Sequence, residues 1–65
     1  MSLELDAIYD RLIDAHDVQN LKQLSVALGN SEAWASLQKR RGKVPLEAVV
    51  QTAIDKGLSV DYILF

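Results

Sequence analysis

The stretch from Leu21 to Pro45 reads LKQLSVALGNSEAWASLQKRRGKVP and decides the fold that the sequence predicts. Two short helical patterns flank Gly29-Asn30-Ser31, and the second pattern runs into a group of basic residues. So short a connection makes neighbouring helices cross steeply instead of lying antiparallel. The stretch therefore predicts a helix-turn-helix, a motif whose second helix presents its N-terminal end to DNA.

Two apolar stripes on either side of this stretch predict one amphipathic helix each, because their residues recur at i, i+3, i+4, i+7 and i+8. The first stripe consists of Leu5, Ile8, Tyr9, Leu12 and Ile13. The second stripe consists of Leu46, Val49, Val50, Ala53 and Ile54, and Pro45 suits the first turn of its helix.

Capping residues set the expected ends of the other helices. Asn20 is a good N-cap for the second helix, and Gly29 supplies a left-handed stop. We expect Ser31 to cap a third helix that runs from Glu32 into the basic residues and ends by Gly42. Ser59 caps a last short helix whose apolar residues are Val60, Tyr62, Ile63 and Phe65. The prediction is an all-α, compact domain of five helices.

Composition limits the classes of protein to be considered. The chain has 65 residues, of which 49% are hydrophobic and 25% charged, so we expect residues 1–65 to form one small domain that buries about 60% of its unfolded surface. The absence of cysteine excludes a disulfide framework and a thiolate metal site. No apolar run reaches the roughly 18 residues of a membrane span, and the start carries Glu4 and Asp6 where a signal peptide is basic. We expect a cytoplasmic protein that does not bind a membrane.

The charges are distributed unevenly along the chain. A formal net charge of -2 argues at first against nucleic acid as a partner. However, most acidic residues fall before residue 18, where Asp6, Asp10 and Asp14 line up on one helix as a solvated face. Four positive charges, by contrast, fall within five residues of the middle of the chain. They are Lys39, Arg40, Arg41 and Lys43.

Residues for catalysis are missing from the sequence. His16 is the one histidine and has no cysteine or second histidine with which to share a metal, so we expect it on the surface at a helix end. Ser25 and the other serines have no accompanying base. We therefore expect no enzyme activity, no cofactor, no metal and no small-molecule substrate.

Three pieces of the chain carry a resemblance to a known family. They are LKQLSVALG from Leu21 to Gly29, RGKVP from Arg41 to Pro45, and KGLSVDYIL from Lys56 to Leu64. With their spacing, they resemble the lambda-repressor-like DNA-binding fold and, more closely, the N-terminal helix-turn-helix domain of the phage CI repressor family.

The resemblance implies a sequence-specific DNA-binding domain of a phage-type transcriptional repressor, with the helix-turn-helix at helices 2 and 3. Its third helix would enter the major groove of a palindromic operator in double-stranded DNA. The chain would be the N-terminal part of a longer repressor in the cytoplasm of a bacterial host cell. It would form a homo-oligomer through a C-terminal domain that is absent here.

Two alignments of the third helix with the family remain open. In the ungapped one, Ala35 and Gln38 face the core, and the groove-facing residues are Ser31, Glu32, Ala33, Ser36, Leu37 and Arg40. If the turn is one residue shorter, Trp34 and Leu37 form the core pair instead, and Ser31, Glu32, Ser36 and Lys39, with or without Arg40, point outward. We favour the second alignment because it buries the two largest apolar groups of the helix.

Candidate DNA contacts follow from these alignments. Short hydroxyl side chains, a carboxylate that accepts from a cytosine amino group and a lysine are candidates for base contacts. The base-contact candidates are Ser31, Glu32, Ser36 and Lys39. Phosphate candidates are the basic side chains near the end of the third helix and the polar start of the second helix, where backbone amides are free. The phosphate candidates are Asn20, Lys22, Gln23, Arg40, Arg41 and Lys43.

A protein-interaction module on the same helical scaffold is the alternative function. The net acidity, Glu32 and the apolar C-terminal end would suit a surface that binds another protein. Such a module would be an inhibitor, an assembly partner or an antitoxin-like regulator.

Overall fold

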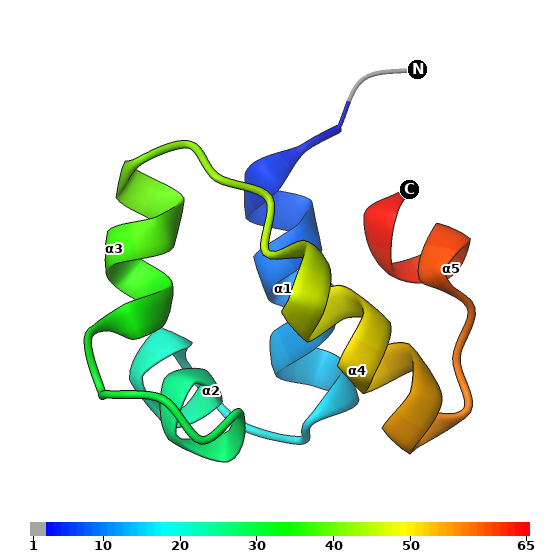
Figure 1. Ribbon diagram of the computed structural model, residues 1–65, viewed down its shortest axis with the longest axis horizontal. Coiled ribbons are helices and arrows are strands. Elements are labelled where there is room, and N and C mark those ends of the chain that lie inside the picture. The colour runs from blue at the N-terminus through cyan, green and yellow to red at the C-terminus, as the bar shows by residue number, and fades with distance from the viewer. Residues whose placement is uncertain (1–2) are drawn as a thin grey trace.

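Five helices build the part of the chain that the computed structural model describes, residues 3–65 (Figure 1). Their bounds are α1 Leu5–Ala15, α2 Leu21–Ala27, α3 Trp34–Arg40, α4 Leu46–Lys56 and α5 Val60–Leu64. No strand occurs among these residues, so the predicted all-α class and the number of helices are confirmed. Residues 1–2 of the predicted single domain lie outside the described residues. Each of the described helices is too short or too polar to traverse a lipid bilayer.

α1 lies at the centre of the arrangement and contacts each of the other four helices. In Figure 1 it runs behind α4, with α3 on one side and α5 on the other. Ile8, Tyr9 and Leu12 of its predicted stripe are fully buried, and Leu5 and Ile13 pack around them. The periodicity of the first helix is thus confirmed, and its apolar face forms the middle of the core.

α4 buries a narrower face than its stripe predicted. The predicted helix is confirmed, and Val49 and Ala53 of its stripe are in the core, but Leu46, Val50 and Ile54 of the same stripe are exposed. α4 contacts only α1 and α5 among the helices, so no partner reaches the i, i+4, i+8 row that these three residues form. In their place Thr52 is buried. It receives a hydrogen-bond partner in His16, whose Nε2 lies 2.8 Å from Thr52 Oγ1.

α5 attaches the end of the chain to α1. Of the apolar residues at this end, Ile63 is fully buried, whereas Tyr62 and Phe65 are exposed. A helix of five residues offers only one side to its neighbours, and here that side carries Ile63. Ser59 caps the helix as predicted, by accepting from the backbone N–H of Tyr62. The Arg11 guanidinium donates to the carbonyls of Ile63 at 3.1 Å and Phe65 at 3.2 Å, which satisfies the end of α5.

Candidate nucleic-acid interface

The start of α2 is fixed by side-chain caps. Asn20 Oδ1 accepts from the backbone N–H of Gln23 at 2.8 Å, which confirms Asn20 as the N-cap. The Gln23 side chain in turn accepts from the backbone N–H of Gln19 at 2.8 Å. This arrangement resembles a capping box, in which two side chains satisfy free amides reciprocally. Two of the predicted phosphate contacts, Asn20 and Gln23, therefore already use a side-chain oxygen within α2.

Left-handed glycines end both helices of the motif. Gly29 follows α2 with φ +80° and Gly42 follows α3 with φ +71°. In each case the two backbone amides after the cap donate to carbonyls of the last helical turn, as in a Schellman motif. A Cβ atom at either glycine would meet nothing within 4 Å, so backbone conformation alone requires glycine there. The predicted left-handed stop at Gly29 is confirmed.

α3 begins later than predicted, and its cap comes from a different serine. The helix starts at Trp34, and the preceding residues form a turn in which the Ser31 carbonyl accepts from the Trp34 N–H at 3.0 Å. Ser31 is therefore not the N-cap. The buried Ser25 of α2 accepts from the Ala35 N–H at 2.9 Å and donates to the Leu21 carbonyl at 2.9 Å. Since an N-cap side chain ordinarily satisfies this second amide of a helix, Ser25 does for α3 what Ser31 was expected to do.

The register of α3 corrects our preferred alignment. Ala35 is fully buried and Gln38 is partly buried, as the ungapped alignment has them. Trp34 packs against the core, but Leu37 is 41% exposed, so the predicted Trp34 and Leu37 core pair is wrong. α3 contacts only α1 and α2, and the small Ala35 allows α2 to approach closely enough for the Ser25 hydrogen bond. Ser36 and Leu37 consequently stay on the exposed side of the helix.

The predicted base-contact residues do not all lie together. Ser31 and Glu32 are exposed in the turn before α3, and Ser36 is exposed on the helix. Lys39 is directed elsewhere: it is partly buried, and its Nζ lies 3.1 Å from Asp6 Oδ1 on α1. The aspartate that was interpreted as part of a solvated face thus ties Lys39 toward α1. Lys39 does not share the exposed side of Ser36.

Lys22 and Glu32 are paired across the motif. Lys22 Nζ at the start of α2 lies 3.1 Å from Glu32 Oε2 in the turn before α3, and both side chains are about two-thirds exposed. An ion pair this exposed contributes little to stability. It nevertheless places a predicted phosphate contact beside a predicted base contact, and it offsets the negative charge of Glu32 locally.

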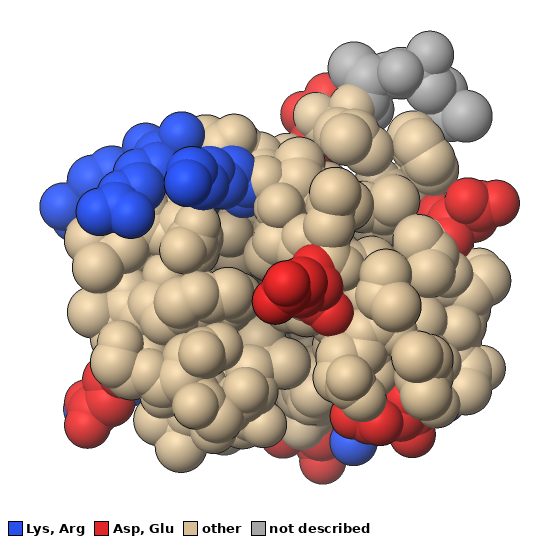
Figure 2. All heavy atoms as spheres, in the orientation of Figure 1, with Lys and Arg blue, Asp and Glu red and all other residues tan. Residues whose placement is uncertain are grey.

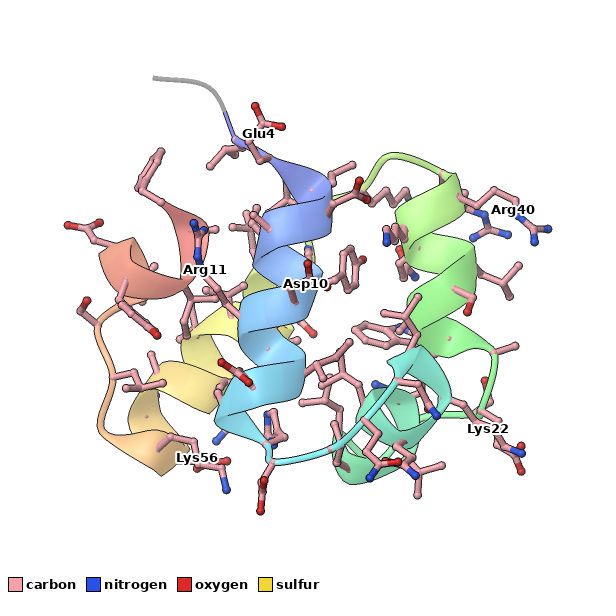
Figure 3. The ribbon with its side chains drawn as sticks, turned by 180° about the vertical axis from the view of Figure 1, so that it is seen from behind. Glu4, Asp10, Arg11, Lys22, Arg40 and Lys56 are labelled. Atoms are coloured by element: carbon pink, nitrogen blue, oxygen red, sulfur yellow. The ribbon has the colours of Figure 1, made fainter. Side chains whose placement is uncertain are left out.

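The basic residues gather over the C-terminal end of α3 (Figure 2). Figure 3 shows Arg40 and Lys22 extending from the same outer edge, the one that α3 and α2 form, away from Glu4, Arg11 and Lys56. The Tyr9 hydroxyl donates to the Lys43 carbonyl at 3.2 Å and so fixes the connection after α3. Burial raises the pKa of Tyr9, which keeps this donor protonated. The buried Tyr9 therefore anchors the backbone at the end of α3 to the core. The exposed basic residues at this end, which we call the basic edge, are Arg40, Arg41 and Lys43.

Two positioning residues escaped sequence reasoning. From the sequence, Ser25 is considered only as a catalytic residue, although a serine between Leu21 and Leu28 on an apolar helical face is a signal for a buried hydroxyl. Tyr9 was assigned to the core alone, and nothing in the sequence indicates that its hydroxyl reaches Lys43. No group of three or more potential metal ligands occurs within residues 3–65.

The fold and this edge define a helix-turn-helix domain: two short helices joined by a glycine turn, the second exposed along one side and followed by basic residues. Comparison with known families agrees, because the bacteriophage CI repressor helix-turn-helix domain matches residues 7–65. The chain belongs to this family of non-enzymatic DNA-binding regulators. No curated protein and no solved structure matches the chain significantly.

Proposed function

We propose that the chain binds a specific operator in double-stranded DNA with α3 in the major groove, as the DNA-binding part of a phage-type repressor. The observation that carries this proposal is the register of α3. With Ala35 buried, the uncharged side chains of Ser36 and Leu37 stay exposed between the turn before α3 and the basic residues after it. A major groove about 12 Å wide admits a helix whose outward side chains are short or slender. These are Ser36 and Leu37 on α3 and Ala33, the residue just before its first turn.

Base readout is assigned to the exposed side of α3 and to the turn before it. Ser36 can exchange hydrogen bonds with base edges, and Glu32 can accept from a cytosine amino group. Leu37, which the corrected register turns outward, can contact a thymine methyl group, as can Ala33. Ser31 lies in the same turn as Glu32, and its hydroxyl can contact a base edge or a phosphate.

Phosphate contacts are assigned to the basic edge and the start of α2. Arg40, Arg41 and Lys43 are exposed and appear in no ion pair among residues 3–65, so their full charge is free for DNA. Lys22 can exchange Glu32 for a phosphate at small cost because both side chains are solvated. The amide groups of Asn20 and Gln23 can still donate while their oxygens cap α2.

The operator is proposed to be palindromic. One α3 offers few base contacts, so useful affinity requires two copies on half-sites about 34 Å apart. Oligomerisation through a further C-terminal domain, as the family resemblance implies, would bring the two copies together.

Selection from a randomised duplex pool tests this function. We would titrate the chain, and a version forced to dimerise, into the pool at two salt concentrations and sequence the retained DNA. Recovery of a two-fold symmetric motif with one-turn spacing is expected. A folded, helical protein that retains no DNA would contradict the proposal and favour an interaction module.

Salt dependence tests the phosphate contacts separately. Each contact contributes about -0.9 to the slope of log affinity against log salt, so Arg40→Ala and Arg41→Ala should each flatten the slope by about one unit. Lys56→Ala is the matched control, since it removes the same charge at the far end of α4 (Figure 3). We expect Ser36→Ala to change sequence preference more than Lys43→Ala does. Equal effects on specific and random DNA would reduce Ser36 to a backbone contact.

A further inference from the structure

A hollow of about 280 Å³ lies between the start of α3 and α4, and none of the residues proposed to contact DNA lines it. Trp34 supplies an aromatic wall, and Glu47 supplies a carboxylate from the first turn of α4. Two amide side chains, Asn30 and Gln51, complete its polar lining. The hollow thus combines an indole with several oxygen acceptors on one open surface.

These acceptors are available to a ligand. Within residues 3–65 Glu47 forms no ion pair, so no side chain neutralises its charge. The N-terminus of α4 stabilises this charge but leaves the carboxylate oxygens exposed to a ligand. The Gln51 amide nitrogen donates to Asp55 Oδ1 at 3.0 Å, which leaves the Gln51 carbonyl oxygen as a free acceptor. An aromatic wall beside a carboxylate and an amide oxygen is the chemistry that recognises an ammonium or guanidinium group.

An apolar row adjoins the hollow. Leu46, Val50 and Ile54 are 57%, 45% and 71% exposed, and they follow one another at i, i+4 and i+8 along α4. A second, shallower hollow is lined by Leu46 and Val50 together with the same Glu47 and Gln51. Leu46 and Val50 therefore form one continuous surface with the acceptors.

The charge of this face favours a basic protein over DNA. In Figure 2 the Lys and Arg atoms of this view gather mainly at one upper edge, while a single acidic group lies near the middle of a broad uncharged area. A carboxylate there would repel phosphates, and apolar side chains gain nothing from a phosphate backbone. A small cation would fill the hollow but leave the row of Leu46, Val50 and Ile54 exposed to water.

We propose that this face is a docking site for a partner protein that places a lysine or arginine side chain beside Trp34 and Glu47. Apolar side chains on either side of that cation lie against Leu46 and Val50. Trp34 is the first residue of α3, so the docked partner contacts the DNA-reading helix at its start. The site therefore gives a regulatory protein direct access to that helix.

Peptide selection tests the docking site. A phage-displayed library of random dodecapeptides is panned against the immobilised wild-type chain, with the bare support as the counter-target. We expect the enriched peptides to carry an Arg or Lys between apolar residues. Trp34 is the one tryptophan of the chain, so we expect a synthetic peptide that fills the hollow to change its fluorescence.

Matched variants locate the contact. Glu47→Gln should weaken the selected peptide at least about tenfold, the effect of losing one charge-assisted hydrogen bond. Asp10→Asn makes the same charge change on α1 and should alter affinity less than twofold. Replacing the peptide's cation by norleucine should cause a loss that is not additive with Glu47→Gln, because coupled partners deviate from additivity.

Four results would overturn the proposal. The first is a library that yields no peptide combining a basic residue with apolar ones. The second is a selected peptide that binds Glu47→Gln and Val50→Ser as tightly as it binds the wild type. A third is self-association that Val50→Ser abolishes, which would make the row an interface between two copies of the chain. A fourth is DNA affinity that rises more for Glu47→Gln than for Asp10→Asn, which would assign the face to DNA.

Discussion

α1 and α3 are held in the molecule by different means. α1 has 11 residues, buries three large side chains and contacts every other helix. α3 has 7 residues, and Ala35 is its one fully buried side chain. Besides the packing of Trp34 and Ala35, polar contacts position α3: the Ser25 hydroxyl at its start, the Lys39–Asp6 ion pair near its end and the Tyr9 hydroxyl just after it. Stability is therefore concentrated in α1, and α3 keeps a side free for recognition.

The largest effect on stability should come from truncating a leucine to alanine in α1, compared with the same truncation in α3. Leu12→Ala empties a fully buried position of α1 and should lower the free energy of unfolding by about 2–5 kcal/mol. Leu37→Ala makes the identical change on the exposed side of α3 and should cost no more than about 0.5 kcal/mol. Urea unfolding followed by circular dichroism measures both. Equal losses would show that α3 is packed as α1 is, and the comparison would fail.

The next effect concerns the polar attachment of α3. Ser25→Ala leaves the buried Ala35 N–H without an acceptor and should cost about 1–3 kcal/mol. Ser31→Ala is the matched control, because Ser31 is exposed and its hydroxyl forms no hydrogen bond within the described chain. We expect urea midpoints to fall for Ser25→Ala alone. If Ser31→Ala were the more destabilising change, Ser31 would be the cap after all.

A smaller effect should follow from loosening the other end of α3. Tyr9→Phe keeps the buried ring but removes the donor to the Lys43 carbonyl, which should cost about 0.5–1.5 kcal/mol. Amide hydrogen exchange should quicken around the connection after Gly42 more than in α1. Tyr62→Phe removes a hydroxyl from an exposed ring and serves as the control. A uniform acceleration in all helices would mean that Tyr9 supports the core and not this connection.

Sequence reasoning succeeded where one helix presents one regular apolar face. The stripe around Ile8 and Leu12 was correct because α1 is central and meets partners along its length. The stripe of α4 predicted the helix correctly but is only partly buried, since periodicity shows that a face is apolar but not whether a neighbour covers it. Nothing in the sequence shows that α4 lacks a partner along Leu46, Val50 and Ile54.

The candidate interface was predictable in its composition but not in its register. The basic residues and the glycine turn identify it from the sequence, and the left-handed Gly29 is as predicted, whereas Lys39 is paired with Asp6. The register of α3 depends on Ser25 and Ala35, two small residues that bury little apolar surface. A rule that buries the largest apolar groups therefore selects Leu37, whereas a hydrogen bond between small residues sets the actual face.

The smallest effect tests the polar contact that α1 makes on its other side, with α4. His16 lies at the end of α1, and its Nε2 is 2.8 Å from Thr52 Oγ1. Desolvation lowers the pKa of His16, and the positive charge of Lys56 lowers it further by a smaller amount. The negative charge of Asp55 opposes this shift. A lowered pKa means that the folded chain binds fewer protons here than the unfolded chain. Stability should therefore decrease as the pH falls through 6.5, the ordinary value, towards the lower pKa of the folded state.

Unfolding of the wild type and of His16→Asn should be compared from pH 7.5 to 5. The carboxylates are common to both chains, so the difference in unfolding free energy isolates His16. That difference should move against the wild type as the pH falls, and added salt should reduce the part that arises from Lys56. A shift in favour of the wild type would mean that Asp55 outweighs desolvation. The contact between α1 and α4 would then be an electrostatic one, like the Lys39–Asp6 pair between α1 and α3.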